Sequence, residues 1–342
     1  MIAKIFSKKR IGMTLVICLL SFALTAIVHL TNIKDLYNAN STDALPIDLQ
    51  PSPCSYVGFE NLMPDDRLGN YLFFYSTVMY VGSLTGRRPC ISTTDDTPLD
   101  SVFDVDIPRV DFNTSGCPLY KFFQCGNGVY DKRVESLVHV SKNKLLLLSG
   151  YFQSWKYAEP IANQLRQQLR FRQEHVQFAD NFLATNVPAG WTTLEFVRVG
   201  VHVRRGDFLT PRLQYTGYAI ASEQYLQRAM SYFVERFPRV QFIVASDDIP
   251  WCQKHVKLSI FNKTDVNITF SVNHNSGQDL ALLANCDHTV MTTGTFSWWA
   301  AWLTNGITVY CADYPKRGSW LSTQIHNTEY YHPGWIGLDN CA

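Results

Sequence analysis

The chain carries two kinds of hydrophobic pattern. Residues 11–30 form one apolar run without a charged side chain, whereas the rest alternates short apolar stretches with polar ones. From about residue 195 the alternation is regular, because runs of β-branched residues take turns with segments whose apolar residues recur at helical spacing. Strands are predicted at 196–203, 240–248, 288–293 and, as the last one, 307–312, and helices at 222–237, 278–286 and 296–306. Strand-helix alternation predicts a parallel, doubly wound sheet.

The stretch from residue 55 to residue 194 has a less regular pattern. A helix is predicted at 68–86 and a strand at 87–93, and 144–155 is predicted as a short buried strand that runs into a loop with exposed aromatic residues. We expect a second α/β domain here, with a cleft between the two domains and a boundary near residue 190. Ligands of doubly wound sheets bind beyond the carboxyl ends of the strands, so we expect the binding and catalytic residues there.

The apolar run of residues 11–30 has the length of a membrane span. Twenty helical residues rise about 30 Å, the thickness of the hydrocarbon core of a bilayer. Basic residues precede the run, and basic flanks stay on the cytoplasmic side. A cleaved signal peptide is the alternative, but the run is long and no small-x-small site closes it. The predicted organisation is a cytoplasmic tail (1–10), a transmembrane signal anchor (11–30), a stem (31–53) and two lumenal subdomains (54–190 and 191–342).

Composition and charge narrow the class of protein. Apolar residues make up 46% and aromatic residues 13% of the 342 residues, which indicates a globular chain with a large core. The formal net charge is +1, so no global field attracts nucleic acid. Any anion that this protein binds must therefore be held by a local cluster of side chains.

Cysteines and glycosylation triplets fit a secretory protein. Of nine cysteines, Cys18 lies in the apolar run, and the other eight are an even number without the spacing of a zinc site. Disulfides are therefore the favoured interpretation, with the pairing left open. N-x-S/T triplets, which mark candidate N-glycosylation sites, occur at Asn40, Asn113, Asn262 and Asn267.

The most informative polar cluster closes the predicted strand 196–203. The sequence there is "VGVHVRRGDF", which places His202, Arg204, Arg205 and Asp207 at or just beyond a strand end. Two guanidinium groups beside a glycine suit bidentate capture of phosphate oxygens. The structural alternatives are an Arg–Asp salt bridge that pins a loop and a buried histidine with both ring nitrogens satisfied. The concentration of these residues at one strand exit favours a binding site.

A second candidate lies between the predicted strand 288–293 and the helix that follows it. Thr293, Gly294, Thr295 and Ser297 lie between that strand and the first turn of the helix, where free backbone N–H groups and hydroxyl donors form an anion site. Simple capping by Thr295 is the structural alternative. The tryptophans of this helix, at 298, 299 and 302, are interpreted as core residues and not as a sugar platform.

A third candidate is Asp279, at the start of the predicted helix 278–286. Its carboxylate has the geometry to accept two hydrogen bonds from the N–H edge of a guanine, or it serves only as a partner of the helix dipole.

Metal binding is not expected. Asp-x-Asp motifs hold Mn²⁺ in many lumenal glycosyltransferases, and "DVD" at 104–106 and "SDD" at 246–248 are similar in letters. The first lies where residues 103, 105 and 107 alternate like an ordinary strand. Paired arginines can neutralise a diphosphate without a cation, so we predict that no metal or other cofactor is required.

Several ordered segments resemble one enzyme family. "VGVHVRRGDF" resembles the H-x-R-R-x-D signature of the α1,2-fucosyltransferases, which is related to the motif of α1,6- and protein O-fucosyltransferases. "DRLGNYLFFY", "LSGYFQSWKY", "VASDDIPWC" and "DLALLANCDHTVMTTGTFSWWAAWL" resemble further segments of the family in the same order. Asp66 stands where the family usually has glycine, and Thr293 to Thr295 depart slightly from its usual last block.

The resemblance implies an inverting, metal-independent transfer of L-fucose from GDP-β-L-fucose to the 2-hydroxyl of a galactose on a glycan. It also implies a GT-B-like pair of Rossmann-like α/β domains in a single-pass Golgi membrane protein, with the donor in the C-terminal domain. By resemblance, donor contacts come from His202, Arg204, Arg205, Asp279, Thr295, Phe296 and Ser297, and the cleft is lined by Arg67, Gly69 and Asn70. Arg204 would bind the β-phosphate. Asp207 is the leading candidate for a general base or else orients the arginines, and Glu223 is a distant second.

Other protein classes remain open from sequence alone. A second enzyme hypothesis is a different lumenal nucleotide-sugar transferase, with another fucose linkage or with a metal and a UDP-sugar. A sulfotransferase would need a phosphate-binding strand-turn-helix near its N-terminal half, and none is visible. A non-catalytic lectin-like membrane protein could keep the aromatic residues and disulfides but has no need for paired arginines at a strand end.

Overall fold

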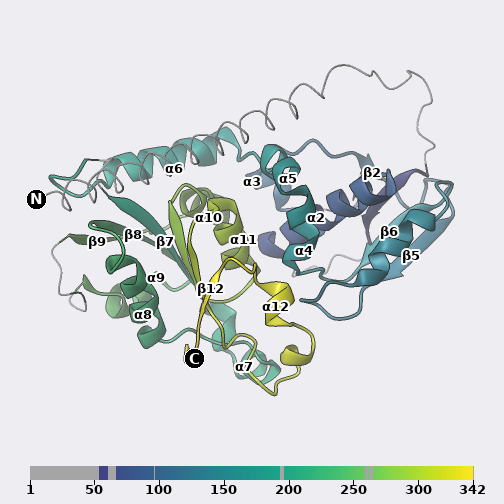
Figure 1. The fold of residues 1–342 in the computed structure, drawn as a ribbon. Helices are drawn as coiled ribbons and strands as arrows, with labels where there is room; N and C mark the ends of the chain where they lie inside the picture. Colours follow the sequence, from purple (N-terminus) through teal and green to yellow (C-terminus); the bar gives the residue numbers. More distant parts are fainter. Residues whose placement is uncertain are drawn as a thin grey trace, which may run out of the picture. The chain divides into compact units, whose positions relative to one another are not determined.

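The computed structural model describes residues 54–60, 67–95, 97–192, 196–258, 261 and 265–341 (Figure 1). These residues belong to one compact unit, Pro51–Ala342. The predicted tail, anchor and stem (1–53) lie outside the described residues. Within the described ranges, no helix combines the length and the apolar character needed to cross a membrane.

The N-terminal half is built on a small parallel sheet. Its strands lie in the order β2-β1-β6-β5, and every neighbouring pair is parallel. The bounds are Tyr56–Phe59 (β1), Arg88–Pro89 (β2), Leu119–Phe123 (β5) and Leu145–Ser149 (β6). Helix α2 (Leu68–Thr85) connects β1 to β2 and ends at Gly86, whose left-handed backbone (φ 61°) suits glycine. The predicted helix 68–86 and the buried strand in 144–155 are therefore confirmed.

The C-terminal half contains a six-stranded parallel sheet in the order β12-β11-β10-β7-β8-β9. The bounds are Val197–Val203 (β7), Val240–Ser246 (β8), Val266–Phe270 (β9), His288–Met291 (β10), Thr308–Cys311 (β11) and Ile336–Leu338 (β12). If strands β7 to β12 are numbered 1 to 6 along the chain, the order in the sheet, read from β9, is 3-2-1-4-5-6. This is the strand order of dinucleotide-binding sheets. The strand order changes direction between β7 and β10, and this switch point is where such sheets bind ligands. The expected mixed α/β class with parallel sheets is confirmed.

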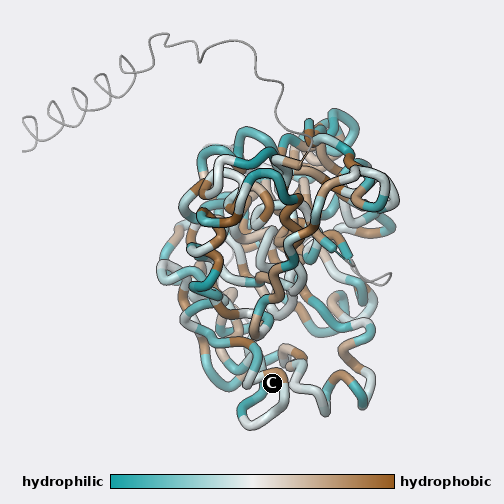
Figure 2. Tube along the Cα trace, turned by 90° about the vertical axis from the view of Figure 1, so that its right-hand side faces the viewer, coloured by the Kyte–Doolittle hydropathy of each residue, from teal (hydrophilic) through white to brown (hydrophobic). Residues whose placement is uncertain are grey.

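Helices cover both faces of the larger sheet. Valines of β7 and β8 pack on α8 (Glu223–Val234) and α9 (Ile249–His255), whereas Ile243 on the opposite face packs on α6 (Gln173–Thr185) and α10 (Ser276–Ala284). In Figure 2 polar segments cover much of the outside of the unit. Helix α6 precedes residue 190 in the chain but packs on α10 of the C-terminal half. The predicted domain boundary near residue 190 stays a prediction.

One hydrophobic cluster joins the two halves. Phe73 of α2 lies 4.7 Å from Trp298 and 5.1 Å from Trp299, ring centre to ring centre, on helix α11 (Thr295–Thr304). Both tryptophans are fully buried, and Trp302 is 4% exposed. The interpretation of the tryptophans as core residues is confirmed, and their packing fixes α2 against α11.

Some predicted elements are wrong. The predicted strand 87–93 is divided between β2 and the separate two-stranded sheet of β3 (Ile91–Ser92) and β4 (Arg109–Val110). Residues 103–107 contain no regular strand and follow the short helix α3 (Leu99–Val102). The last strand is β12 and not 307–312, and Phe152 in the loop after β6 is buried and not exposed.

The cysteines form fewer disulfides than eight would allow. Cys54 pairs with Cys117 and Cys311 with Cys341, whereas Cys90, Cys125, Cys252 and Cys286 are free thiols. The expectation of disulfides is confirmed for two pairs, each of which ties distant parts of the chain.

Of the predicted glycosylation sites, Asn113 is exposed and Asn267 is partly buried in β9. Asn40 and Asn262 lie outside the described residues. All four stay predictions.

Candidate active site

The strand exits of β7 and β10 lie side by side at the switch point. Val199, Val201 and Val203 are fully buried, which fixes β7, and His202 is paired in register with Met291 of β10. Beyond the last ladder pair, the Arg204 N–H donates to Thr292 Oγ1 at 2.9 Å. The first residue after β7 is thereby attached to the first residue after β10, and the two predicted clusters meet in space.

His202 is a buried neutral ring. Its Nδ1 lies 2.5 Å from Ser297 Oγ, and its ring centre lies 4.8 Å from that of Phe296. Burial, with a smaller contribution from the nearby Arg204 charge, lowers the pKa of His202 to about 3. Ser297 is also fully buried and donates to Thr293 O at 3.1 Å. This pair links β7 to the first turn of α11.

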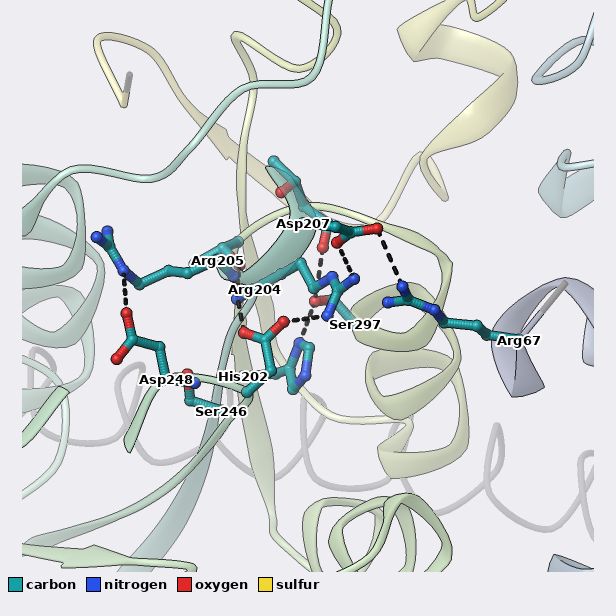
Figure 3. Close-up of polar contacts among 11 residues, drawn as sticks. Arg67, His202, Arg204, Arg205, Asp207, Ser246, Asp248 and Ser297 are labelled. Carbon is teal, nitrogen blue, oxygen red and sulfur yellow. Dashed lines mark hydrogen bonds and ion pairs between the residues drawn. The ribbon is translucent and has the colours of Figure 1, made fainter. Parts of the chain in front are cut away.

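Arg204 is held between two carboxylates (Figure 3). Its Nη1 pairs with Asp247 and its Nη2 with Asp207. The Arg204 side chain is 16% exposed, and a guanidinium so far removed from water requires charged partners. The salt bridge considered as a structural alternative is therefore present.

Arg205 points away from Arg204 (Figure 3). Its Nε donates to Asp248 Oδ2 at 3.0 Å, and its guanidinium carbon lies 3.8 Å from the ring centre of Trp251. The Arg205 backbone N–H donates to Asp247 Oδ1 at 2.9 Å. These contacts brace the turn after β7 against β8, and the donor contact expected of Arg205 stays a prediction.

Gly206 allows this turn to approach β8. A Cβ at Gly206 would lie 2.3 Å from Asp247 Oδ2, so any larger residue would displace the carboxylate that holds Arg204.

The N-terminal half contributes Arg67 to the same cluster. Arg67 immediately precedes α2, and its Nη2 donates to Asp207 Oδ2 at 3.1 Å. Asp207 therefore connects an arginine of each half. The Arg67 side chain is 63% exposed, which makes this ion pair weak by itself.

The first turns of α2 and α11 pack closely against each other. A Cβ at Gly69 would lie 2.6 Å from the Phe296 backbone N and from Thr295 Oγ1. Only glycine permits this approach, because the atoms in the way include backbone. The predicted cleft residues and the predicted phosphate loop therefore lie side by side, with two helix N-termini converging on the Arg204 cluster.

Asp279 lies apart from that cluster. Its Oδ1 accepts a hydrogen bond from Ser271 Oγ at 2.5 Å, beyond the carboxyl end of β9, and Ser271 Oγ also lies 2.7 Å from His274 Nδ1. Since β9 is two strands from β7, this position is roughly 10 Å along the sheet edge from the exit of β7. Burial raises the pKa of Asp279 to about 6, and the Ser271 hydrogen bond opposes the rise.

The remaining acidic candidates have other partners. Glu223, the second candidate for a base, accepts from His255 Nδ1 at 2.9 Å and from Gln227 Nε2 at 3.1 Å on α8. Asp104 is exposed, with an Arg170 nitrogen 3.8 Å away. Among the described residues, no group of three or more His, Cys, Asp or Glu side chains is arranged to hold a metal ion.

Sequence reasoning missed the role of two acids. Asp247 and Asp248 were considered only as a metal motif, whereas they hold Arg204 and Arg205. Their signal was present, because they follow the next strand in the chain, and consecutive strands are commonly neighbours.

Comparisons with known proteins agree with the resemblance. The family model of glycosyl transferase family 11 matches residues 48–339. Galactoside alpha-(1,2)-fucosyltransferase 1 of Rattus norvegicus is 29% identical over 309 residues, 89% of this chain and 78% of the relative. The protein of the same name from Saimiri sciureus is 30% identical over 292 residues, 84% of this chain and 76% of the relative.

Two solved structures show a distant similarity to this chain. POFUT1 in complex with GDP has 13% identity and a TM-score of 0.47, and covers 75% of this chain and 99% of its own. A glycosyl transferase family 9 protein from Veillonella parvula has 12% identity and a TM-score of 0.49, and covers 87% of this chain and 90% of its own.

The raised pKa of Asp279 predicts a pH-dependent effect of Asp279→Asn. The ordinary pKa is 3.8 and the folded pKa is about 6, so the folded protein holds this proton more tightly. Its contribution to stability is therefore present below pH 4 and is lost as the pH rises through 6. Thermal unfolding at pH 4 to 8 should show the variant gaining about 3 kcal/mol on the wild type across this window.

The exposed Asp104 offers the control, because Asp104→Asn removes the same charge from a solvated position. A stability difference for Asp279→Asn that does not change between pH 4 and pH 8 would contradict the raised pKa.

Proposed function

The chain belongs to glycosyl transferase family 11, and from this premise we propose that it transfers L-fucose from GDP-β-L-fucose to the 2-hydroxyl of a β-galactose on a glycan. The observation that carries the proposal is the pair of arginines at the exit of β7, at the switch point of a nucleotide-binding type of sheet. The curated relatives are named for this reaction.

The donor fits along the carboxyl edge of the larger sheet. Its diphosphate would lie at Arg204 and at the first turn of α11, where Thr295, Phe296 and Ser297 leave backbone N–H groups without intrahelical partners. Its guanine would reach Asp279, roughly 10 Å away over β8, a distance that a nucleoside diphosphate spans. His202 would stay neutral beneath this site and hold the start of α11 in place.

Donor binding exchanges the partners of Arg204. Asp207 and Asp247 compensate the guanidinium, so an arriving phosphate would replace one carboxylate without leaving the buried charge uncompensated. Asp207 is the one to leave, because its second partner is the exposed guanidinium of Arg67, whereas Asp247 is also held by the backbone N–H of Arg205. The exchange releases Asp207 from Arg204 at the moment when the fucose arrives.

The transfer itself is an inverting displacement. The galactose 2-hydroxyl attacks the anomeric carbon of fucose on the face opposite GDP, the new carbon–oxygen bond forms, and the bond to the phosphate oxygen breaks. Negative charge develops on the departing GDP, where Arg204 stabilises it most in the transition state. Asp207 takes the hydroxyl proton as general base. Arg67, Gly69 and Asn70 border the fucose and the acceptor from the N-terminal half.

The arrangement in two subdomains and the cellular location of the protein are parts of the same proposal. Two Rossmann-like subdomains, 54–190 and 191–342, would form a GT-B-like pair with the donor in the second. The apolar run 11–30 with its basic flank supports a single-pass type II protein of the Golgi membrane, with the catalytic part in the lumen. Arg204 takes the place of a metal at the diphosphate, so no cofactor is required.

A transfer assay tests the proposed reaction. The full chain, purified in detergent, is incubated with labelled GDP-fucose and a panel of β-galactosides, with and without EDTA. We expect transfer that GDP inhibits and UDP does not, that EDTA leaves intact, and whose product an α1,2-specific fucosidase cleaves. Absence of transfer to every β-galactoside by folded protein would contradict the assignment, and loss of activity in EDTA would contradict metal independence.

Replacement of Arg204 separates its ligand role from a structural one. Arg204→Lys keeps the charge but loses the two-nitrogen fork, so we expect kcat to fall about 100- to 1,000-fold. The melting temperature should fall far less than for a core substitution. Arg212→Lys, at an exposed position on the neighbouring helix α7 (Pro211–Thr216), is the matched control and should retain wild-type activity. Strong thermal destabilisation with near-normal kcat would instead assign Arg204 to the salt bridge alone.

A further inference from the structure

Three large apolar side chains beside the proposed site are exposed to solvent. Tyr215 is 91% exposed, Trp320 is 59% exposed and Leu209 is 42% exposed. Single exposed apolar residues are common on protein surfaces, whereas several that lie together commonly mark a binding surface. We call these three residues the apolar platform.

The platform begins next to Arg204. The buried side chain of Phe208 lies under Arg204, with its ring centre 5.0 Å from the guanidinium carbon. Leu209 follows, and its carbonyl oxygen accepts a hydrogen bond from Gln214 Nε2 at 3.0 Å. Tyr215 lies four residues after the start of α7, about 6 Å along the helix axis. Leu209 and Tyr215 therefore lead outward from the arginine.

Trp320 joins the platform from the segment that follows β11. In this segment the Lys316 N–H donates to Gly217 O at 2.9 Å, and a Cβ at Gly217 would lie 2.1 Å from Ser319 Oγ. Gly217 comes two residues after Tyr215, and Trp320 comes directly after Ser319. The end of α7 is thereby attached to the turn that carries Trp320, and the two segments lie side by side in Figure 1.

The platform lies at the ligand-binding edge of the larger sheet. Strands β7 and β11 are parallel, so the segments that follow them leave from the same edge, the one at which such sheets bind ligands. In the strand order, β10 and β11 lie on one side of β7, and β8 and β9 lie on the other. The platform is therefore on the side of Arg204 opposite to Asp279.

This placement points to the acceptor and not to the nucleotide. The proposed function has the guanine at Asp279, so the fucose, at the other end of the donor, lies on the platform side of Arg204. An inverting displacement brings the galactose hydroxyl to the face of fucose opposite GDP. The acceptor glycan therefore lies farther still from Asp279, in the direction of the platform.

The residue types of the platform suit a sugar ring. A pyranose whose hydroxyls are equatorial exposes C–H groups on its two ring faces, and flat aromatic side chains can cover such a face. Tyrosine and tryptophan add a polar group at the rim of the ring, which can bond a sugar hydroxyl.

We propose that the apolar platform binds the sugar to which the acceptor galactose is linked, with the rings of Tyr215 and Trp320 packed on that sugar. The inference rests on the proposed function and deepens it, because it names the acceptor class. The preferred acceptor is an oligosaccharide that ends in β-galactose, and an isolated galactoside is a poorer one.

Two acceptors of different length test the proposal on the full chain in detergent. Lactose carries a second sugar behind the galactose, and methyl β-galactoside does not. We expect Tyr215→Ala and Trp320→Ala each to lower kcat/KM for lactose about tenfold, the effect of losing one ring contact. For methyl β-galactoside kcat/KM should stay within about twofold of the wild type, and the Kd for GDP should not change. Tyr215→Phe keeps the ring and should stay within about threefold for both acceptors.

Tyr120→Ala is the matched control. Tyr120 is also an exposed aromatic residue, but it lies on β5, the outer strand of the smaller sheet, far from α7 in Figure 1. Its replacement should leave kcat/KM for both acceptors within about twofold of the wild type.

The outcomes separate this inference from the proposed function. A wild-type protein that transfers no fucose to either acceptor overturns both. An active wild type whose alanine variants keep normal kcat/KM for lactose, or lose activity equally on both acceptors, overturns only the role of the platform. The same holds if Tyr215→Ala and Trp320→Ala convert a dimer into a monomer in gel filtration with unchanged kinetics, because the platform would then be an interface between two copies of the chain.

Discussion

The contact between the first turns of α2 and α11 is the constraint on which the rest of the site depends. Gly69 lets one helix start lie against the backbone of the other, and the packing of Phe73 on Trp298 and Trp299 holds the two helices there. Each half alone would present one helix N-terminus. Together they place Arg67 and Asn70 of the N-terminal half at the strand exits of the C-terminal sheet, where the phosphate-binding residues of the proposed site converge.

Charge compensation stabilises the two largely buried arginines after β7. Arg204 and Arg205 are 16% and 13% exposed, and each has a carboxylate partner supplied by β8 or by the turn after β7. The salt-bridge interpretation and the ligand interpretation of the "HVRRGD" segment are therefore compatible. Carboxylates neutralise the arginines, and under the proposed function a diphosphate would take the place of Asp207.

Some elements and site residues could be predicted from the sequence, and others could not. The valines of β7 and the helical spacing of α8 are local patterns, so these elements and the cluster at the exit of β7 could be predicted. The pairing of Arg204 with Asp247 requires β7 and β8 to be neighbours in the sheet, which their succession along the chain favours but does not establish. Strand β12 has only three residues and leaves no pattern. The positive φ of Phe152 and the choice of cysteine partners depend on distant packing, which no local pattern encodes.

The most direct test of the account is a crystal structure of the protein with GDP bound. We expect the diphosphate between the exits of β7 and β10, within hydrogen-bond distance of the Arg204 guanidinium and of the first N–H groups of α11. We also expect that Asp207 has left Arg204 while Asp247 remains. A GDP bound elsewhere, with Arg204 still held by both carboxylates, would contradict it.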